Sequence, residues 1–180
     1  MINMAAKSLP DVVYLRECLD YNPETGNFFW RWRPRSHFTS DRGHWQWNPK
    51  YAGRPAGGLS PEDGTHKITI NLIVYRAHRL AWILVHGAPI PDEIDHINCN
   101  RSDNRIANLR LATRSENAAN LPRRRNNTSG VKGVSFDNTK KWFVAYVGSR
   151  RLGVFRTLEE AAVARRDAAE RLHGEFVRHE

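Results

Sequence analysis

The first apolar residues of the chain recur at helical spacing. Within residues 9–22 this spacing predicts a short helix that begins near Asp11, because an aspartate side chain accepts hydrogen bonds from the free N–H groups of a first helical turn. Asn22 and Pro23 are expected to end the helix, and the following sequence PETG predicts a turn.

Aromatic and basic residues alternate in residues 27–38, which predicts a strand with one buried and one cationic face. The alternating residues are Trp30 and Trp32 with Arg31, Arg33 and Arg35. Such a set can stack on nucleic-acid bases and hold phosphates, or the tryptophans can lie in the core with the arginines in water. Residues 36–66 are rich in Gly, Pro, Ser and Asp and predict loops, with one short strand around residues 45–47.

A strand and a helix are predicted next. Ile68, Ile70 and Leu72 alternate with polar residues, as the two faces of a strand require. After Tyr75 the segment AHRLAWILVHG favours a helix that ends at Gly87.

The densest polar stretch of the chain, residues 92–121, predicts the order strand, loop, strand, helix. Its loop is NCNRSDN and its second strand is Leu109–Ala112. Thr113 and Glu116 form a capping-box pattern that opens the helix. Four polar residues recur at definite spacings within this stretch: Asp95, the adjacent His96, and two asparagines twelve and twenty-one residues beyond it, Asn108 and Asn117.

The last part of the chain predicts a three-stranded sheet with one packing helix. The strands are expected at residues 131–137, 141–147 and 151–155. A second capping-box pattern, Thr157 and Glu160, opens a helix that is broken near Gly174.

Positive charge is concentrated in one segment. The 180 residues carry a net charge of +9, and residues 122–156 contain nine cations and one anion, Asp137. A local field of this strength attracts a polyanion, so nucleic acid is the predicted partner. The arginine triplet at residues 123–125 also has a plainer interpretation, as a solubilising linker.

Membrane insertion and secretion are not expected. No window holds about 18 consecutive apolar residues, and the amino-terminal segment lacks a long apolar run followed by a small-residue cleavage site. The two cysteines, Cys18 and Cys99, form no zinc-ligand pattern. We therefore expect an intracellular protein with reduced thiols and no structural zinc.

The polar residues of the stretch 92–121 supply what phosphodiester hydrolysis requires. Asp95 offers a hard carboxylate oxygen and Asn117 a carbonyl oxygen, a set that suits one Mg²⁺ or Mn²⁺ ion. His96, with an ordinary pKa near 6.5, can take a proton from water, and alternation along a strand should point it away from Asp95. Asn108 can hydrogen-bond backbone groups and hold the loop that carries His96.

This stretch resembles a known family. The residues that carry the resemblance are YRAHRLAW, DEIDHIN, SDNRIANLRLAT and EN. They are similar to those of the phage and homing branch of the HNH endonucleases, which have the ββα-metal fold. The resemblance covers about residues 68–121. It implies that Asp95 and Asn117 are metal ligands, that His96 is the general base, and that Asn108 is the structural asparagine. Asn120 competes for the second ligand role, and His78 either supports the site or packs beside Trp82.

The carboxy-terminal segment, residues 129–176, resembles the AP2 DNA-binding domain. The matching features are G-V-x-F, KW before a strand, LGVF, and T-x-E-E-A before the helix. Double-stranded DNA is then the implied partner, with contacts to phosphates rather than bases. The expected contact residues are Arg123, Arg124, Arg125, Lys132, Lys140, Lys141, Arg150 and Arg151. Ala145 and Val147 can touch thymine methyl groups or be ordinary strand residues.

The sequence therefore predicts an α+β protein with three parts: an HNH module at residues 1–121, a basic linker at 122–129, and an AP2-like domain at 130–180. The predicted function is metal-dependent DNA cleavage of the homing type, with nicking expected unless two copies assemble. The alternative is a DNA-binding regulator with a degenerate nuclease domain.

Overall fold

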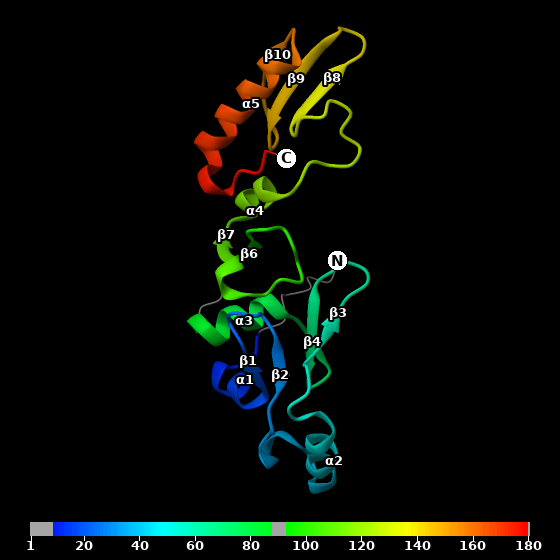
Figure 1. Ribbon diagram of the computed structural model, residues 1–180, viewed down its shortest axis with the longest axis vertical. Coiled ribbons are helices and arrows are strands. Elements are labelled where there is room, and N and C mark those ends of the chain that lie inside the picture. The colour runs from blue at the N-terminus through cyan, green and yellow to red at the C-terminus, as the bar shows by residue number, and fades with distance from the viewer. Residues whose placement is uncertain (1–8, 88–92, 180) are drawn as a thin grey trace, which may run out of the picture. The chain divides into compact units, whose positions relative to one another are not determined.

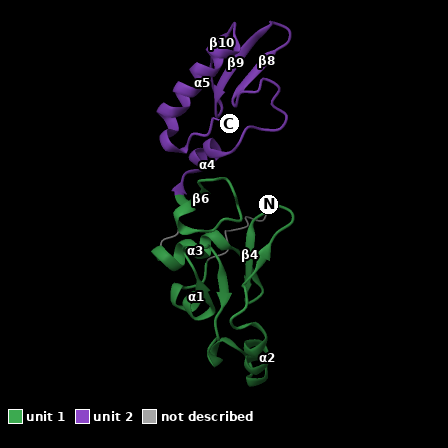
Figure 2. Ribbon diagram, in the orientation of Figure 1, with its two compact units in different colours: residues 1–110 green, residues 111–180 purple. Residues whose placement is uncertain are grey.

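A computed structural model describes residues 9–87 and 93–179 (Figure 1). The chain divides into two compact units, residues 1–110 and 111–180 (Figure 2). The domain boundaries expected from sequence, after residues 121 and 129, stay a prediction. The first eight residues, which entered the argument against secretion, lie outside the described residues.

The described residues of the first unit form short helices and three small sheets. Its elements are α1 (Val12–Cys18), β1 (Leu19–Tyr21), β2 (Phe28–Trp30), the 3₁₀ turn η1 (Arg35–His37), α2 (Asp41–Tyr51), β3 (Gly58–Leu59), β4 (His66–Ile70), β5 (Ile73–Arg76), α3 (Ala77–His86), β6 (Glu93–His96), the 3₁₀ turn η2 (Ile106–Asn108) and β7 (Leu109–Ala112), which runs past the end of the unit. Leu15, Phe28, Ile68 and Leu80 belong to one buried cluster, so α1, the hairpin β1–β2, β4 and α3 share a core.

Helix α1 begins as the sequence predicted but is shorter. Asp11 accepts a hydrogen bond from the Val13 N–H at 2.7 Å, as a capping residue should. The helix ends at Cys18 rather than near Asn22, because residues 19–21 pair with residues 28–30 in the hairpin β1–β2. The expected turn at residues 23–26 closes this hairpin, and the Asn22 side chain accepts from two of its N–H groups.

The prediction for residues 36–66 was wrong, because residues 41–51 form helix α2 instead of a loop with a short strand. Neither Gly43 nor Pro49 favours a helix. Tertiary contacts hold the helix: the Asn48 side chain, fully buried, bonds both the backbone N–H and C=O of Arg33. The Trp47 ring also packs edge-on against Trp30, with centroids 5.2 Å apart.

The expected faces of the segment 27–38 are reversed at two residues. Arg33 is buried at 5% exposure, whereas Trp32 is 53% exposed. The Arg33 guanidinium lies over the rings of Phe38 and Trp47, 5.1 Å from each centroid. Cation–π contact and hydrogen bonds therefore offset the cost of burying this charge.

The strand predicted through Leu72 is interrupted by a hairpin turn. Asn71 and Leu72 both have positive φ, 49° and 65°, and they join β4 to β5. Leu72 is consequently 96% exposed rather than part of a strand face. The helix expected after Tyr75 is present as α3, and it ends at Gly87, whose φ of 76° suits a glycine.

The second unit packs one helix against a three-stranded antiparallel sheet of order β10-β9-β8 (Figure 1). Its elements are α4 (Arg114–Asn120), β8 (Val134–Asp137), β9 (Trp142–Val147), β10 (Arg150–Phe155), α5 (Leu158–His173) and the 3₁₀ turn η3 (Gly174–Phe176). Val134, Ala145 and Ala161 form its buried core. Both predicted capping boxes are confirmed, at Thr113 for α4 and at Thr157 for α5.

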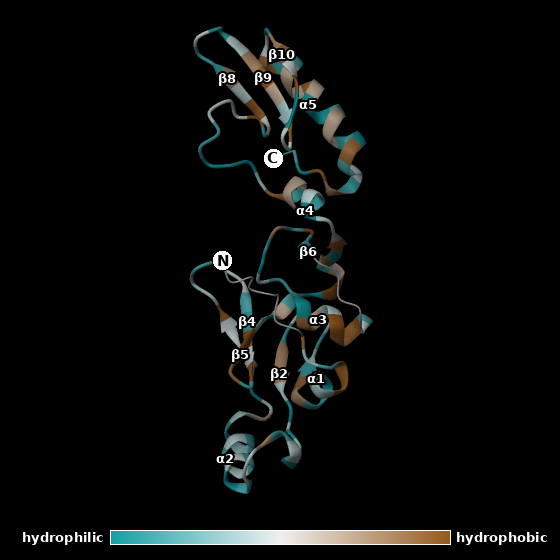
Figure 3. Ribbon diagram, turned by 180° about the vertical axis from the view of Figure 1, so that it is seen from behind, coloured by the Kyte–Doolittle hydropathy of each residue, from teal (hydrophilic) through white to brown (hydrophobic). Residues whose placement is uncertain are grey.

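The connection from α4 to β8 carries the arginine triplet, and Figure 3 shows much of it coloured as hydrophilic. Among the residues described, no helix has both the length and the apolar character of a membrane span.

Candidate active site

Strand β6 places the two adjacent polar residues of the candidate site. Asp95 and His96 are both buried, at 3% and 7% exposure. Successive side chains of a strand point to opposite faces, and these two have different neighbours accordingly. Asp95 contacts Arg110, whereas the His96 ring lies against the His78 ring.

The Asp95 carboxylate is held by an arginine of the paired strand. Its Oδ2 atom accepts a hydrogen bond from Nε of Arg110 at 2.9 Å and forms an ion pair with Nη2 of Arg110, also at 2.9 Å. The Arg110 side chain is only 16% exposed, so the pair is largely shielded from water. Sequence analysis did not identify Arg110, although it is the cation between Leu109 and Leu111 in the predicted strand.

His96 lies among groups that disfavour its protonated form. Burial lowers the pKa of His96, and the Asn104 side chain and the Asp95 charge offset this in part. The His78 ring stands nearly perpendicular to the His96 ring, with centroids 5.0 Å apart. Burial and the neighbouring positive charges lower the pKa of His78 to about 3. Both imidazoles are therefore neutral near pH 7.

Asn108 ties together the loop between β6 and β7. Its Oδ1 accepts from the Asn98 N–H at 3.1 Å, and its Nδ2 donates to Asn98 Oδ1 at 3.0 Å and to the Asp103 carbonyl at 2.9 Å. The backbone N–H of Ile97 also donates to the Asn108 carbonyl at 2.9 Å. These are the contacts expected of an asparagine that holds the loop after His96.

The hairpin β1–β2 supports the same loop from outside. The sequence placed residues 1–121 in one module but did not predict the contacts between the hairpin and the loop. The Tyr21 hydroxyl donates to the Asn104 carbonyl at 2.7 Å, and the Ile106 N–H donates to the Pro23 carbonyl at 3.0 Å. Gly26 allows this approach, because a Cβ there would lie 2.6 Å from the Arg105 nitrogen. The hairpin is thus part of the framework of the candidate site.

Helix α4 carries both candidates for the second metal ligand. Asn117 is half-buried, and Asn120 is buried at 6% exposure. Both residues belong to the second unit, whereas Asp95 and His96 belong to the first. The pairing of Asp95 with either asparagine stays a prediction.

The chemistry of Asp95 on β6 suits a hard divalent ion. The Asp95 carboxylate is the kind of oxygen donor that Mg²⁺ or Mn²⁺ prefers, and these ions commonly bind one or two carboxylates and complete their shell with waters and substrate phosphate. In residues 9–87 and 93–179, no three or more His, Cys, Asp or Glu side chains gather to form a metal site. Both cysteines are free thiols.

The predicted phosphate-contacting cations differ in their surroundings. Most of them are exposed: the arginine triplet, Lys140, Lys141, Arg150 and Arg151. Lys132 is half-buried, and its ammonium donates to the carbonyls of Ala119 and Leu121 at the end of α4. Asp137, the one anion of the basic segment, accepts from N–H groups of the β8–β9 turn.

Ala145 and Val147 are not available to thymine methyl groups. Ala145 is fully buried and Val147 is 7% exposed. Ala145 belongs to the core cluster with Val134 and Ala161. The interpretation of these two residues as ordinary strand residues is the correct one.

Comparison with known proteins identifies the class. Residues 75–119, which include Asp95, His96, Asn108 and Asn117, match the HNH endonuclease family, and the chain belongs to this family. It is 37% identical over 109 residues to Protein 3.8 of Escherichia phage T7, covering 57% of this chain and 88% of the phage protein. It is 33% identical over 114 residues to an uncharacterized HNH endonuclease, L560, of Acanthamoeba polyphaga mimivirus, covering 62% of this chain and 60% of that protein. No solved structure matches the chain.

Proposed function

We propose that this protein is a divalent-metal-dependent DNA endonuclease of the homing type. In this proposal His96 is the general base that takes a proton from the attacking water, and Asn108 holds the loop that positions it. Asp95 and Asn117 hold one Mg²⁺ or Mn²⁺ ion. The match of residues 75–119 to the HNH endonuclease family supports nuclease activity and a DNA substrate.

One observation carries the proposal: Asp95 and His96 are adjacent and buried on β6, and they face different neighbours, Arg110 and His78. A general base must be unprotonated before the reaction, and burial lowers the pKa of His96. Asp95, directly before it, offers an oxygen ligand on the other face of β6. A base and a metal ligand on adjacent residues can act on one phosphate without competing for the same space.

A bound divalent ion would neutralise charge on the scissile phosphate and on the leaving 3′ oxygen. The protein's own groups do the rest. The bonds from Asn108 to Asn98 and Asp103 fix the loop after His96, so that the imidazole would be held where it can activate a water for in-line attack. Because one such site cuts one strand, nicking is the expected product unless two copies assemble.

The second unit would hold the enzyme on double-stranded DNA as an AP2-like domain. Its antiparallel sheet with one packed helix is consistent with that assignment. Exposed cations on the linker, the β8–β9 turn and β10 would contact phosphates, which position a protein without specifying sequence.

A second function is favoured by the pairing of Asp95 with Arg110. The Arg110 guanidinium, through one hydrogen bond and an ion pair to Oδ2, already neutralises this carboxylate, as in a structural ion pair. On that interpretation the protein is a DNA-binding regulator with a degenerate nuclease domain. A regulator needs neither the ion nor His96, so the two functions differ in a measurable way.

The test is cleavage of supercoiled plasmid and of presumed host or phage DNA, with Mg²⁺, with Mn²⁺ and with EDTA. His96→Ala is compared with His86→Ala, which removes an exposed histidine of the same unit. DNA binding is measured for all three proteins, because both functions predict salt-sensitive binding.

Metal-dependent nicking that is lost in His96→Ala but kept in His86→Ala, with DNA binding unchanged, is the expected result. Cleavage that survives in His96→Ala would mean that another group is the base. A folded, DNA-binding protein that cuts none of these substrates with either metal would favour the regulator.

A further inference from the structure

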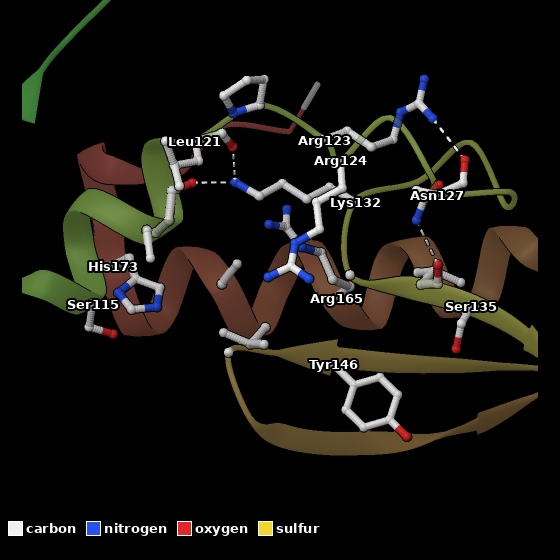
Figure 4. A pocket seen from close by; sticks show the side chains of 18 of the residues that line it. Ser115, Leu121, Arg123, Arg124, Asn127, Lys132, Ser135, Tyr146, Arg165 and His173 are labelled. Atoms are coloured by element: carbon white, nitrogen blue, oxygen red, sulfur yellow. Dashed lines mark hydrogen bonds between the residues drawn. The ribbon is translucent and has the colours of Figure 1, made fainter. Parts of the chain in front are cut away.

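A cavity of about 520 Å³ is lined by residues of the second unit. Its walls come from α4, the arginine linker, β8, β9 and α5, and Figure 4 shows its lining side chains. The cationic side chains among them are Arg123, Arg124, Lys132 and Arg165. None of the described lining residues carries a carboxylate.

Arg165 is the unusual member of this set. It projects from α5 and is 94% buried, with an exposure of 6%. No described residue accepts a hydrogen bond from its Nε atom. Its Nη1 lies 3.3 Å from Nδ1 of His179, and no described carboxylate forms an ion pair with it. A guanidinium removed from water without an anion is costly, and burial accordingly lowers the pKa of Arg165.

The backbone at Gly133 leaves space for the Arg165 side chain. Gly133 has a φ of 74°, and a Cβ there would lie 3.3 Å from Nε of Arg165 and 2.5 Å from the Tyr146 carbonyl oxygen. Lys132, next to it, has its ammonium on the Ala119 and Leu121 carbonyls and so fastens the linker to the end of α4. Arg123 donates from Nη1 to the Asn127 carbonyl at 3.2 Å. Among the described lining residues, Arg165 on α5 and Arg124 on the linker are therefore the arginines that can serve a ligand.

We propose that this cavity binds a phosphate group through Arg165 and Arg124. Guanidinium groups present paired N–H donors that match phosphate oxygens, and a phosphate would supply the negative charge that Arg165 lacks. His173, which also lines the cavity, can add a further hydrogen bond. The volume exceeds that of one phosphate and leaves room for an attached sugar.

This proposal goes beyond the proposed nuclease function, because Arg165 is not among the expected DNA contacts. The phosphate can belong to the DNA backbone or to a free ion or nucleotide, and the chemistry at the two arginines is the same. Cleavage activity is not needed for the site to exist, so its test does not depend on His96.

The experiment uses the full chain and isothermal titration calorimetry at constant ionic strength. Inorganic phosphate and a deoxynucleoside monophosphate are titrated into the wild type, into Arg165→Gln and into Arg166→Gln. Arg166 is the matched control, since it follows Arg165 on α5 but is exposed. A second pair, Arg124→Gln and Arg125→Gln, changes neighbouring exposed linker arginines of which only the first lines the described cavity.

Saturable binding by the wild type, weakened about tenfold or more in Arg165→Gln and Arg124→Gln but not in the two controls, is expected. Repeating the titrations with a short DNA duplex bound to the protein shows whether the phosphate in the cavity comes from DNA or from a free ion or nucleotide. Loss of phosphate binding would mean that the DNA backbone occupies the cavity, and retained binding would mean a free phosphate or nucleotide.

Two results would overturn the proposal. One is no saturable binding of either probe by the wild type, and the other is equal affinity in Arg124→Gln and Arg125→Gln. Circular dichroism reports whether Arg165→Gln is folded. If it is not, the linker pair decides, because those side chains are exposed and their removal leaves no buried gap.

Discussion

Arg110 holds a single oxygen of Asp95 through a hydrogen bond from Nε and an ion pair with Nη2, each 2.9 Å long. The two residues lie on strands β6 and β7, which form a two-stranded sheet. The pair neutralises a buried carboxylate at the position where the family's active site is expected. Arg110 is consequently a structural partner of the site and competes with any cation that Asp95 binds.

Replacing Arg110 with methionine should lower the free energy of unfolding by about 3 kcal/mol, because it leaves the Asp95 charge buried without its partner. Urea unfolding followed by tryptophan fluorescence measures this, since all tryptophans except Trp142 belong to the first unit. If Asp95 is a metal ligand, Mn²⁺ should stabilise this variant more than the wild type. The double variant with Asp95→Asn should recover part of the loss and no longer respond to Mn²⁺.

Gly26→Ala should damage the candidate site, because Gly26 lies in the hairpin turn that packs against the site's loop. The added Cβ would lie 2.6 Å from the Arg105 nitrogen, at a φ of 75° that disfavours alanine. We expect a loss of about 3 kcal/mol in stability and a fall in plasmid cleavage. Gly64→Ala is the control, because its φ is 66° but no described atom lies within 4 Å of the added Cβ. It should cost only about 1 kcal/mol and leave cleavage unchanged, and equal losses in both variants would refute the proposed support.

Local signals allowed much of the fold to be predicted. The capping residues Asp11, Thr113 and Thr157 are local, and the helices they begin are present. Helix α2 was missed because its stability is not local: Asn48 bonds to Arg33 fifteen residues away, and no periodicity in the sequence carries that information. Arg33 was placed in water for the same reason, since its aromatic partners come from another element.

For the candidate site, sequence reasoning identified residues but not their supports. The spacing of His96 and Asn108 indicated a strand, a loop and a second strand, and the structure has this order. The bond from Tyr21 to the Asn104 carbonyl spans 83 residues. The pairing of His78 with His96 joins α3 to β6. Contacts between residues so far apart in the sequence depend on how the hairpin and α3 pack in three dimensions.

Acid should destabilise the first unit through His78. Its pKa is lowered to about 3 in the folded state, whereas the unfolded value is near 6.5. The unfolded chain therefore binds a proton that the folded chain does not, and stability falls as the pH drops below 6.5. This group alone should cost about 2 kcal/mol at pH 5.

Urea unfolding at pH 7 and pH 5 measures the effect. Between pH 7 and pH 5 the free energy of unfolding should fall by about 2 kcal/mol less in His78→Gln than in the wild type. His86→Gln, at an exposed position, should behave as the wild type does. If His78→Gln and the wild type have the same pH dependence, His78 is not the buried neutral group described above.

The two capping boxes allow a comparison between a helix that carries a predicted metal ligand, α4, and one that does not, α5. Thr113 accepts from the Glu116 N–H, and Thr157 accepts from the Glu160 N–H, both at 3.2 Å. Each threonine-to-alanine change should cost about 1 kcal/mol of helix stability. Helix α4 has 7 residues and α5 has 16, so the same loss should disorder α4 far more.

Asn117 lies on α4, and on the proposed function its oxygen must be held in place to bind the ion. Thr113→Ala should therefore slow plasmid nicking severalfold and raise the Mg²⁺ concentration needed for half-maximal rate. Thr157→Ala should leave both quantities unchanged at low salt, where DNA binding is saturated. Equal effects of the two changes on nicking would argue against a ligand on α4, and helix content from circular dichroism shows whether the expected fraying occurred.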